Sequence, residues 1–189
     1  MAQLDTQQSG VTVRPPQGTW VIDPVHSTIE FSVRHLVAAK VRGHFTQFTG
    51  RIDVADPPEN STVSAEIVAA SMDTRSPERD MHLRSADFLD VGKYPVITYR
   101  STAVKHLGGQ QWLINGELTM HGVTRPVTLD ATYGGTVVDA FGAERLIAGA
   151  RTTMDREEFG LTWNQTLESG GLVVGKRIEV DIDVQAVRA

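Results

Sequence analysis

Apolar and polar residues alternate along most of the chain after residue 18, which is the period of β-strands that bury one face. The last segment shows the alternation most clearly, with one face apolar and the other polar: Ile178, Val180, Ile182 and Val184 against Glu179, Asp181, Asp183 and Gln185. The pattern as a whole predicts eight strands, near residues 27–36, 41–55, 62–71, 95–107, 111–121, 124–134, 144–155 and 173–187.

Glycine residues occur between several of these strands. Gly108-Gly109 and Gly134-Gly135 predict hairpin turns, and Gly122 suits the connection between the fifth and sixth strands. Short connections between successive strands imply an up-and-down meander, and closing eight strands into a barrel removes both exposed edges. The predicted fold class is therefore all-β, with an eight-stranded antiparallel up-and-down barrel.

One segment departs from the strand period. Residues 76–78 are a serine, a proline and a glutamate, which suit an N-cap, the first helical position and the first turn. Met81 and Phe88 then fall on one helical face. This pattern predicts a short helix over residues 77–90 that caps one end of the barrel, either as a lid that lifts or as a fixed plug.

Composition and charge narrow the class of protein. The 189 residues suit one domain, with residues 1–17 as a flexible N-terminal tail and 18–189 as the barrel. The lack of a basic stripe argues against nucleic-acid binding. The net charge of −5 argues against electrostatic binding to anionic membranes. There is no cysteine for disulfides or thiol chemistry, and no signal-peptide pattern at the start. We therefore expect a soluble, cytoplasmic protein.

The interior of such a barrel is either packed with side chains or open to a ligand. The inferred inward face is rich in small residues: Ala65, Ala69, Gly116, Ala131, Ala148 and Ala150. Aromatic residues make up only 6% of the chain, so few large side chains are available to fill that space. This favours a cavity, with a solid core as the alternative.

Six groups of residues have a familiar order and spacing: Trp20 to Ser27, Phe31 to His35, Val41 to Phe45 with Phe48 to Gly50, Arg79 to Val91 with Lys93 to Pro95, Gly116 to Thr124 with Pro126 and Val127, and Arg156 to Leu161. Together they resemble the YceI-like, polyisoprenoid-binding family over about residues 18–187. The resemblance implies a lipocalin-like barrel with a long apolar tunnel that holds an isoprenoid or similar lipid. It further implies a homodimer, and we expect a carrier function in lipid transport with transient membrane contact.

The candidate tunnel lining consists of apolar side chains on the inferred inward faces of the strands and helix: Phe31, Val33, Phe45, Phe48, Ile67, Met81, Phe88, Leu118, Met120 and Leu129. His35 ends one of these faces. A single polar group among apolar walls suits contact with a lipid head group near the tunnel mouth. Ordinary core packing is the alternative for the apolar residues, and a satisfied core or rim histidine is the alternative for His35.

Arg79, Asp80 and His82 form a cluster of polar residues in which Asp80 and His82 could be a pair of metal ligands. A metal site, however, needs three or more ligands at defined spacing, and no partner motif is evident. We interpret Arg79 and Asp80 as residues that tie the helix to the barrel rim. Arg156, with residues 159–161, is expected to support the same rim, where Gly160 permits a turn that other residues do not adopt readily.

Enzyme signatures such as a Gly-x-Ser-x-Gly elbow, a phosphate-binding glycine loop or a His-Glu-x-x-His motif are missing from the sequence. Residues 23–27 contain the Asp, His and Ser of a triad, yet nearness in sequence does not establish the geometry of one. We predict no catalytic residue, no metal ligand and no cofactor apart from the bound lipid. Two alternatives stay open: a haem- or metal-binding barrel with His35, His44 or His121 as ligand, and a stress-related enzyme acting on an apolar substrate.

Overall fold

The computed structural model describes residues 14–36, 39–166 and 172–189. Its strands are β1 (Gly18–Ile22), β2 (Thr28–His35), β3 (Ala39–Phe45), β4 (Phe48–Val54), β5 (Thr62–Val68), β6 (Met72–Asp73), β7 (Val96–Gly108), β8 (Gln111–Met120), β9 (Val123–Val138), β10 (Glu144–Asp155) and β11 (Val174–Arg188). The helices are α1 (Pro77–Arg84) and the short 3-10 segments η1 (Pro58–Asn60), η2 (Ala69–Ser71) and η3 (Arg156–Phe159).

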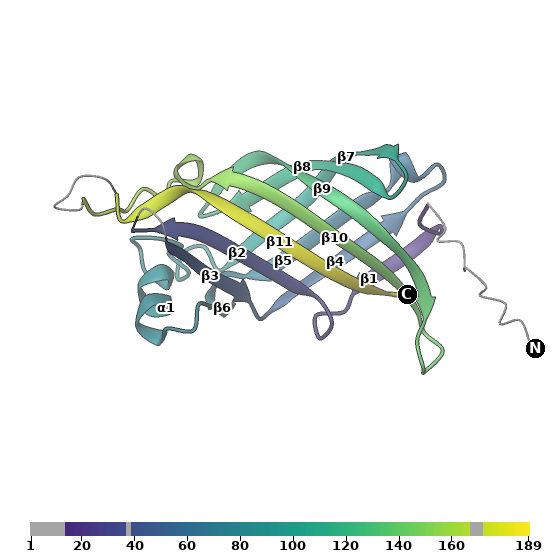
Figure 1. The fold of residues 1–189 in the computed structure, drawn as a ribbon, viewed down its shortest axis with the longest axis horizontal. Helices are drawn as coiled ribbons and strands as arrows, with labels where there is room; N and C mark the ends of the chain where they lie inside the picture. The colour runs from purple at the N-terminus through teal and green to yellow at the C-terminus, as the bar shows by residue number, and fades with distance from the viewer. Residues whose placement is uncertain (1–13, 37–38, 167–171) are drawn as a thin grey trace, which may run out of the picture.

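The strands close into a barrel (Figure 1). Eight antiparallel strands follow one another in the order β1, β4, β5, β7, β8, β9, β10 and β11, and β11 pairs back with β1. The sheet continues past β11 through β2, β3 and β6. This confirms the predicted eight-stranded antiparallel barrel with one short helix.

Two features of the first part of the chain were not predicted by the alternation: strand β1 and the break between β3 and β4. β1 and β2 both pair with β11, at Ile22↔Ala186 and Thr28↔Asp183, so together they occupy one edge of that long strand. The predicted strand 27–36 corresponds to β2, whereas β1 was not predicted. The predicted strand 41–55 is two strands, β3 and β4, which pair with β2 and β1 respectively.

The hairpin turn predicted at Gly134-Gly135 is wrong, because both glycines lie inside β9. Gly135 pairs with Ile147 and Tyr133 pairs with Ala148, which leaves Gly134 as the extra residue of a β-bulge. Glycine within a strand often marks a bulge of this kind. The turn predicted at Gly122 is present, and His121 and Gly122 both have positive φ, as a type I′ turn requires.

Helix α1 lies at one end of the barrel, beside β3 and β6 (Figure 1). It ends at Arg84 and not at residue 90, because Ser85 adopts an extended conformation and its N–H bonds to the carbonyl of His82. The predicted packing face is wrong for Met81, which is 68% exposed. Phe88 is buried but follows the helix. No helix among the described residues is long and apolar enough to cross a membrane.

Two groups of buried side chains fill different parts of the barrel. One group, which includes Trp20 at 0% exposure, packs where β1 meets β4 and β11: Trp20, Val54, Trp112, Ala131, Tyr133, Leu146 and Ala186. Figure 1 shows β1 and α1 at opposite ends of the molecule, so this group closes the end away from the helix. The second group, which includes Phe48, Leu118 and Phe159, surrounds the space between that end and the helix.

Candidate functional site

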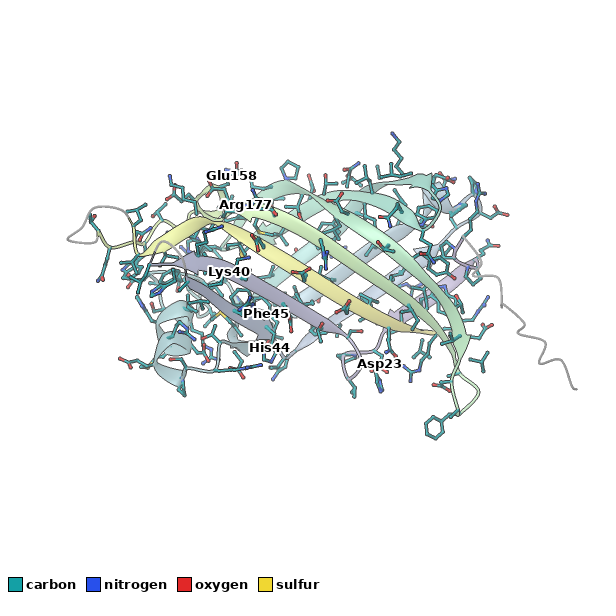
Figure 2. All side chains as sticks on the ribbon, in the orientation of Figure 1. Asp23, Lys40, His44, Phe45, Glu158 and Arg177 are labelled. Atoms are coloured by element: carbon teal, nitrogen blue, oxygen red, sulfur yellow. The ribbon has the colours of Figure 1, made fainter. Side chains whose placement is uncertain are left out.

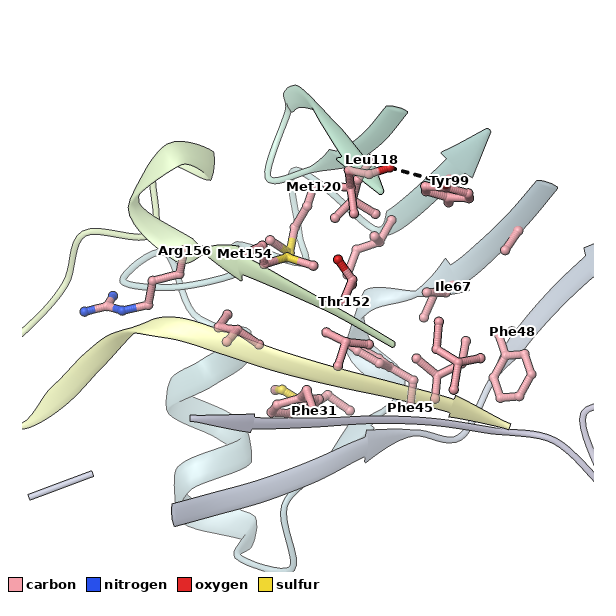
Figure 3. Close-up of a pocket in the computed structure, with 18 of the residues that line it drawn as sticks. Phe31, Phe45, Phe48, Ile67, Tyr99, Leu118, Met120, Thr152, Met154 and Arg156 are labelled. Carbon is pink, nitrogen blue, oxygen red and sulfur yellow. Dashed lines mark hydrogen bonds between the residues drawn. The ribbon is translucent and has the colours of Figure 1, made fainter. Parts of the chain in front are cut away.

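The barrel encloses a cavity of about 530 Å³. Its walls are almost wholly apolar and come from the inward faces of the strands, with further contributions from α1 and the segment after η3 (Figure 3). The volume falls within the range of about 300 to 1,000 Å³ that is usual for small-molecule sites. The cavity is long: its lining on β11 runs from Val174 to Val184, which is about 33 Å of strand at 3.3 Å per residue.

Strand geometry decides which side chains border this cavity. In β2, Phe31, Val33 and His35 point inward, whereas Ser32 and Arg34 lie on the outer face. The rings of Phe31 and Phe45 meet across β2 and β3 with centroids 5.6 Å apart. Because Phe31 and Val180 are cross-strand partners, the wall continues without interruption into β11.

The small residues of the inward face do not all leave empty space. A Cβ on Gly116 would lie 2.4 Å from the ring of Tyr99, so that tyrosine already occupies the room which the glycine provides. Neither Gly116 nor Ala69 is among the lining residues. The alanines that do border the cavity lie at the middle of their strands: Ala65, Ala131, Ala148 and Ala150.

The structure brings together nearly all of the residues predicted from the sequence as tunnel lining. Those that border the cavity are Phe31, Val33, His35, Phe45, Phe48, Ile67, Phe88, Leu118, Met120 and Leu129. Met81 does not border it, in keeping with its exposure to solvent. Contact between any of these side chains and a ligand stays a prediction.

Sequence reasoning missed several lining residues, among them Tyr99, Met154 and Trp163. Tyr99 is buried and donates a hydrogen bond from its hydroxyl to the carbonyl of Ile114 at 2.9 Å. Burial raises the pKa of Tyr99 to about 12, so the hydroxyl is protonated at neutral pH. The alternation in β7 and β10 contained the signal for Tyr99 and Met154. Trp163 lies outside any strand, where no periodic signal exists.

One charged side chain is buried at the edge of the cavity. Arg156 is 2% exposed and borders the cavity near the start of β11 (Figure 3). Its Nε donates to the carbonyl of Gly175 at 3.0 Å and its Nη1 donates to the carbonyl of Leu161, whereas Nη2 has no partner among the described residues. Burial lowers the pKa of the guanidinium from its usual value. Arg156 thus holds η3 and the following segment against β11, as expected for a rim support, and Gly160 has the expected positive φ of 78°.

The interpretation of Arg79 and Asp80 as ties is confirmed. Asp80 is buried and accepts hydrogen bonds from Thr74 N at 3.0 Å and Thr74 Oγ1 at 2.5 Å. Arg79 donates to Thr74 Oγ1 at 2.7 Å and to the carbonyl of Thr74 at 2.6 Å. Because Thr74 directly follows β6, these bonds fasten α1 to the barrel. Within the described ranges, no three His, Cys, Asp or Glu side chains form a group that could hold a metal ion.

The histidines considered as haem or metal ligands lie apart. His35 borders the cavity, whereas His44 is on the outer face of β3, opposite Glu30 and Asp73. His121 is in the turn between β8 and β9, with Nδ1 at 3.1 Å from the carbonyl oxygen of Phe159. The structure does not bring these three side chains to one place.

Hydrogen bonds and an ion pair hold the connection between β1 and β2 against β10 and β11, and they involve the triad-type residues Asp23 and Ser27. Asp23 Oδ2 lies 2.8 Å from His26 Nδ1 and 2.7 Å from Arg145 Nη1. The hydrogen bond from Arg145, followed by that from His26, lowers the pKa of Asp23 to about 2. The hydroxyl of Ser27 donates to the carbonyl of Gln185 and accepts from its N–H. Ser27 is therefore engaged with the backbone of β11 and not with His26.

Comparisons with known proteins agree with this geometry. A family model described as a YceI-like domain matches residues 20–186. A UPF0312 protein of Pseudomonas putida strain GB-1 is 38% identical over 165 residues, which is 86% of this chain and 82% of that protein. A UPF0312 protein of Pseudomonas savastanoi pv. phaseolicola is 34% identical over 164 residues, again 86% of this chain and 82% of the relative.

Solved structures share the same fold. Burkholderia cenocepacia BcnA has a TM-score of 0.75 at 17% identity, covering 87% of this chain and 98% of its own. A Campylobacter jejuni YCEI protein has a TM-score of 0.70 at 23% identity, covering 100% and 99%. A polyisoprenoid binding domain from Saccharophagus degradans, implicated in plant cell wall breakdown, has a TM-score of 0.69 at 15% identity, covering 90% and 98%. At these identities the likeness shows the fold alone.

Proposed function

The chain belongs to the YceI-like domain family, and from that premise we propose that it binds and carries a long apolar lipid of the polyisoprenoid or isoprenoid quinone kind. The observation that carries the proposal is the long cavity of about 530 Å³ with almost wholly apolar walls. A space of this kind excludes charged or strongly polar ligands, because they would lose their hydration without gaining hydrogen bonds. It suits a hydrocarbon chain, which gains free energy from leaving water at every methylene.

The energetics of such a ligand favour a carrier. A forty-carbon prenyl chain gains about 30 kcal/mol on transfer from water at about 0.8 kcal/mol per methylene, which exceeds the practical affinity limit of about 18 to 21 kcal/mol. In a cell the lipid comes from a bilayer, which is as apolar as the cavity. The net free energy of transfer between bilayer and protein is then small, so uptake and release are both feasible.

The family and the wall chemistry favour a binding protein over an enzyme. The triad-type residues Asp23, His26 and Ser27 lie in the connection between β1 and β2, and the Ser27 hydroxyl is engaged with Gln185. A homodimer and a cytoplasmic location, expected from the family resemblance and the sequence, stay predictions.

Filling the cavity tests the proposal. Ala150 borders the cavity at the middle of β10 and pairs with Ala131 and Ile182, so Ala150→Phe should occupy the space that the lipid needs. We expect the delipidated wild-type protein to take up one prenyl lipid per chain, measured by native mass spectrometry, and the variant to lose at least tenfold in affinity. Thr153→Phe is the matched control, because Thr153 lies on the outer face of the same strand. Equal uptake by both variants would rule out this cavity as the binding site.

A further inference from the structure

A groove of about 260 Å³ lies on the outer face of β2, β3 and β11 and is lined by four cationic side chains: Arg34, Lys40, Lys176 and Arg177. We call these four residues the basic groove. Figure 2 shows Lys40 and Arg177 on the half of the barrel that carries α1. The strand period explains the arrangement: residues next to inward-facing Val33, His35 and Val41 must face outward.

Two of the four cations of the basic groove have a carboxylate as an ion-pair partner, and Arg177 has Asp155 as its cross-strand neighbour on β10. Lys40 pairs with Glu179 at 2.5 Å and Lys176 pairs with Glu157 at 2.7 Å. In the described part of the chain, neither Arg34 nor Arg177 forms an ion pair. Arg34 and Lys40 are also direct cross-strand partners, and like charges in that position destabilise a sheet. Arg34 and Arg177 are therefore the two cations of the groove that are available to an anionic partner.

This excess of positive charge is local, because the chain as a whole has a net charge of −5. Farther along the same strands the outward residues become acidic, with Glu30 on β2 and Asp181 and Asp183 on β11. Arg151 on β10 pairs with Asp181, so Glu30 and Asp183 are the carboxylates among these that have no ion pair within the described residues. A local cluster of cations can attract an anionic surface even when the protein as a whole is acidic.

Exposed leucines lie next to the basic groove, where the cavity ends. The N–H of Leu36 donates to the carbonyl of Val173 at 2.9 Å, and Val174 pairs with His35. His35, Val173 and Val174 all border the cavity. Leu36 and Leu172 are 50% and 43% exposed. Apolar tips beside basic side chains are the combination that inserts into the interface of a bilayer.

We propose that this end of the barrel, formed by the basic groove with Leu36 and Leu172, docks on the surface of a bilayer that contains anionic phospholipids. Docking brings the end of the cavity at His35 and Val173 against the membrane, so that a long apolar lipid passes between bilayer and protein without crossing water. This inference rests on the proposed lipid-binding function and adds the surface from which the ligand is taken.

Vesicle binding tests the proposal with the whole protein. We use delipidated protein with vesicles of phosphatidylcholine containing about one-third phosphatidylglycerol, with pure phosphatidylcholine as the reference, and measure co-flotation. The wild-type protein should bind the anionic vesicles, and binding should weaken with added salt. Arg34→Gln/Arg177→Gln should lower the partition coefficient roughly 25-fold, from about a fivefold loss for each cation near an anionic leaflet. Arg100→Gln/Lys105→Gln, which changes net charge equally on exposed positions of β7, should change it less than threefold.

Three outcomes would overturn the docking surface: equal binding of wild type to both vesicle types, equal losses in the two double variants, or displacement by inorganic phosphate beyond that caused by sodium chloride at matched ionic strength. The last would identify a site for free phosphate. Uptake of a detergent-solubilised prenyl lipid, measured without vesicles on the same variants, separates this proposal from the function it rests on. If uptake persists while vesicle binding fails, only the docking surface is wrong; if uptake fails in the wild type, the lipid-binding function itself is wrong.

Discussion

The guanidinium of Arg156 is held below the surface by two backbone carbonyls, those of Gly175 and Leu161. These carbonyls belong to segments that border the end of the cavity, one at the start of β11 and one after η3. A buried arginine is costly to desolvate, and each hydrogen bond that it makes compensates part of that cost. The side chain therefore stabilises the rim through its hydrogen bonds rather than through an ion pair.

We predict that Arg156→Met lowers the free energy of unfolding by about 2 to 3 kcal/mol, since both carbonyls lose a charged donor. Urea denaturation measures the change. Arg151→Met is the control: its side chain is largely exposed and pairs with Asp181 on the outer face, so the loss there should stay below about 1 kcal/mol. Similar losses in the two variants would mean that the buried contacts of Arg156 contribute little.

Inward-facing residues on strands were predictable one by one because the alternation of a strand fixes which face each side chain takes. Leu118, Met120 and Leu129 border the cavity for that reason. The prediction that Met81 lines the cavity was wrong, because it placed Met81 and Phe88 on one face of a helix that continued to residue 90. Trp163 was missed because a residue in an irregular segment is positioned by its contacts, here with His82 and Phe88, and not by a period.

Among the elements, the long strands in the second half of the chain were predicted to within a few residues, apart from the far end of β9. The break between β3 and β4 was not predicted, because its cause lies elsewhere in the chain. Thr46 N bonds to the carbonyl of Ser71 at 3.1 Å, and Gln47 N bonds to Ser71 Oγ at 3.1 Å. A partner 24 residues away leaves no trace in the local pattern. The bulge at Gly134 depends in the same way on its register with β10.

Helix α1 is tied to the chain that precedes it at several points. Besides the bonds from Arg79 and Asp80 to Thr74, Arg84 donates to the carbonyls of Ala70 at 2.8 Å and Met72 at 2.6 Å. All of these hydrogen bonds are made within the chain, to Thr74, Ala70 and Met72. The contacts therefore favour the fixed plug over the lid, two alternatives that the sequence left open.

We predict that amide hydrogen exchange in α1 is the same in lipid-free and lipid-bound protein, because the helix is fastened by hydrogen bonds within the chain. Asp80→Ala should accelerate exchange in both states by removing the acceptor for Thr74. Glu78→Ala, an exposed position on the same helix, should have little effect. Faster exchange of α1 in the lipid-free wild type alone would identify a lid.

At the scale of the whole molecule, the closed end, the cavity and the basic groove follow one another along the length of the barrel. The barrel is closed at one end by the group of side chains around Trp20, and its cavity reaches His35 and Val173 toward the other. The basic groove and the exposed leucines lie at that second end. Composition alone could not predict this polarity, because net charge and residue counts contain no positions. Only the folded register of β2, β3 and β11 brings the cations together.

The central claim is that the cavity holds a long apolar lipid, and native mass spectrometry of the purified protein tests it most directly. We expect a population whose mass exceeds that of the chain by one lipid, and we expect organic extraction of the same sample to yield that lipid in stoichiometric amount. If several independent preparations carry no apolar species, and added prenyl lipids leave the mass of the protein unchanged, the cavity is not a lipid site and the account is contradicted.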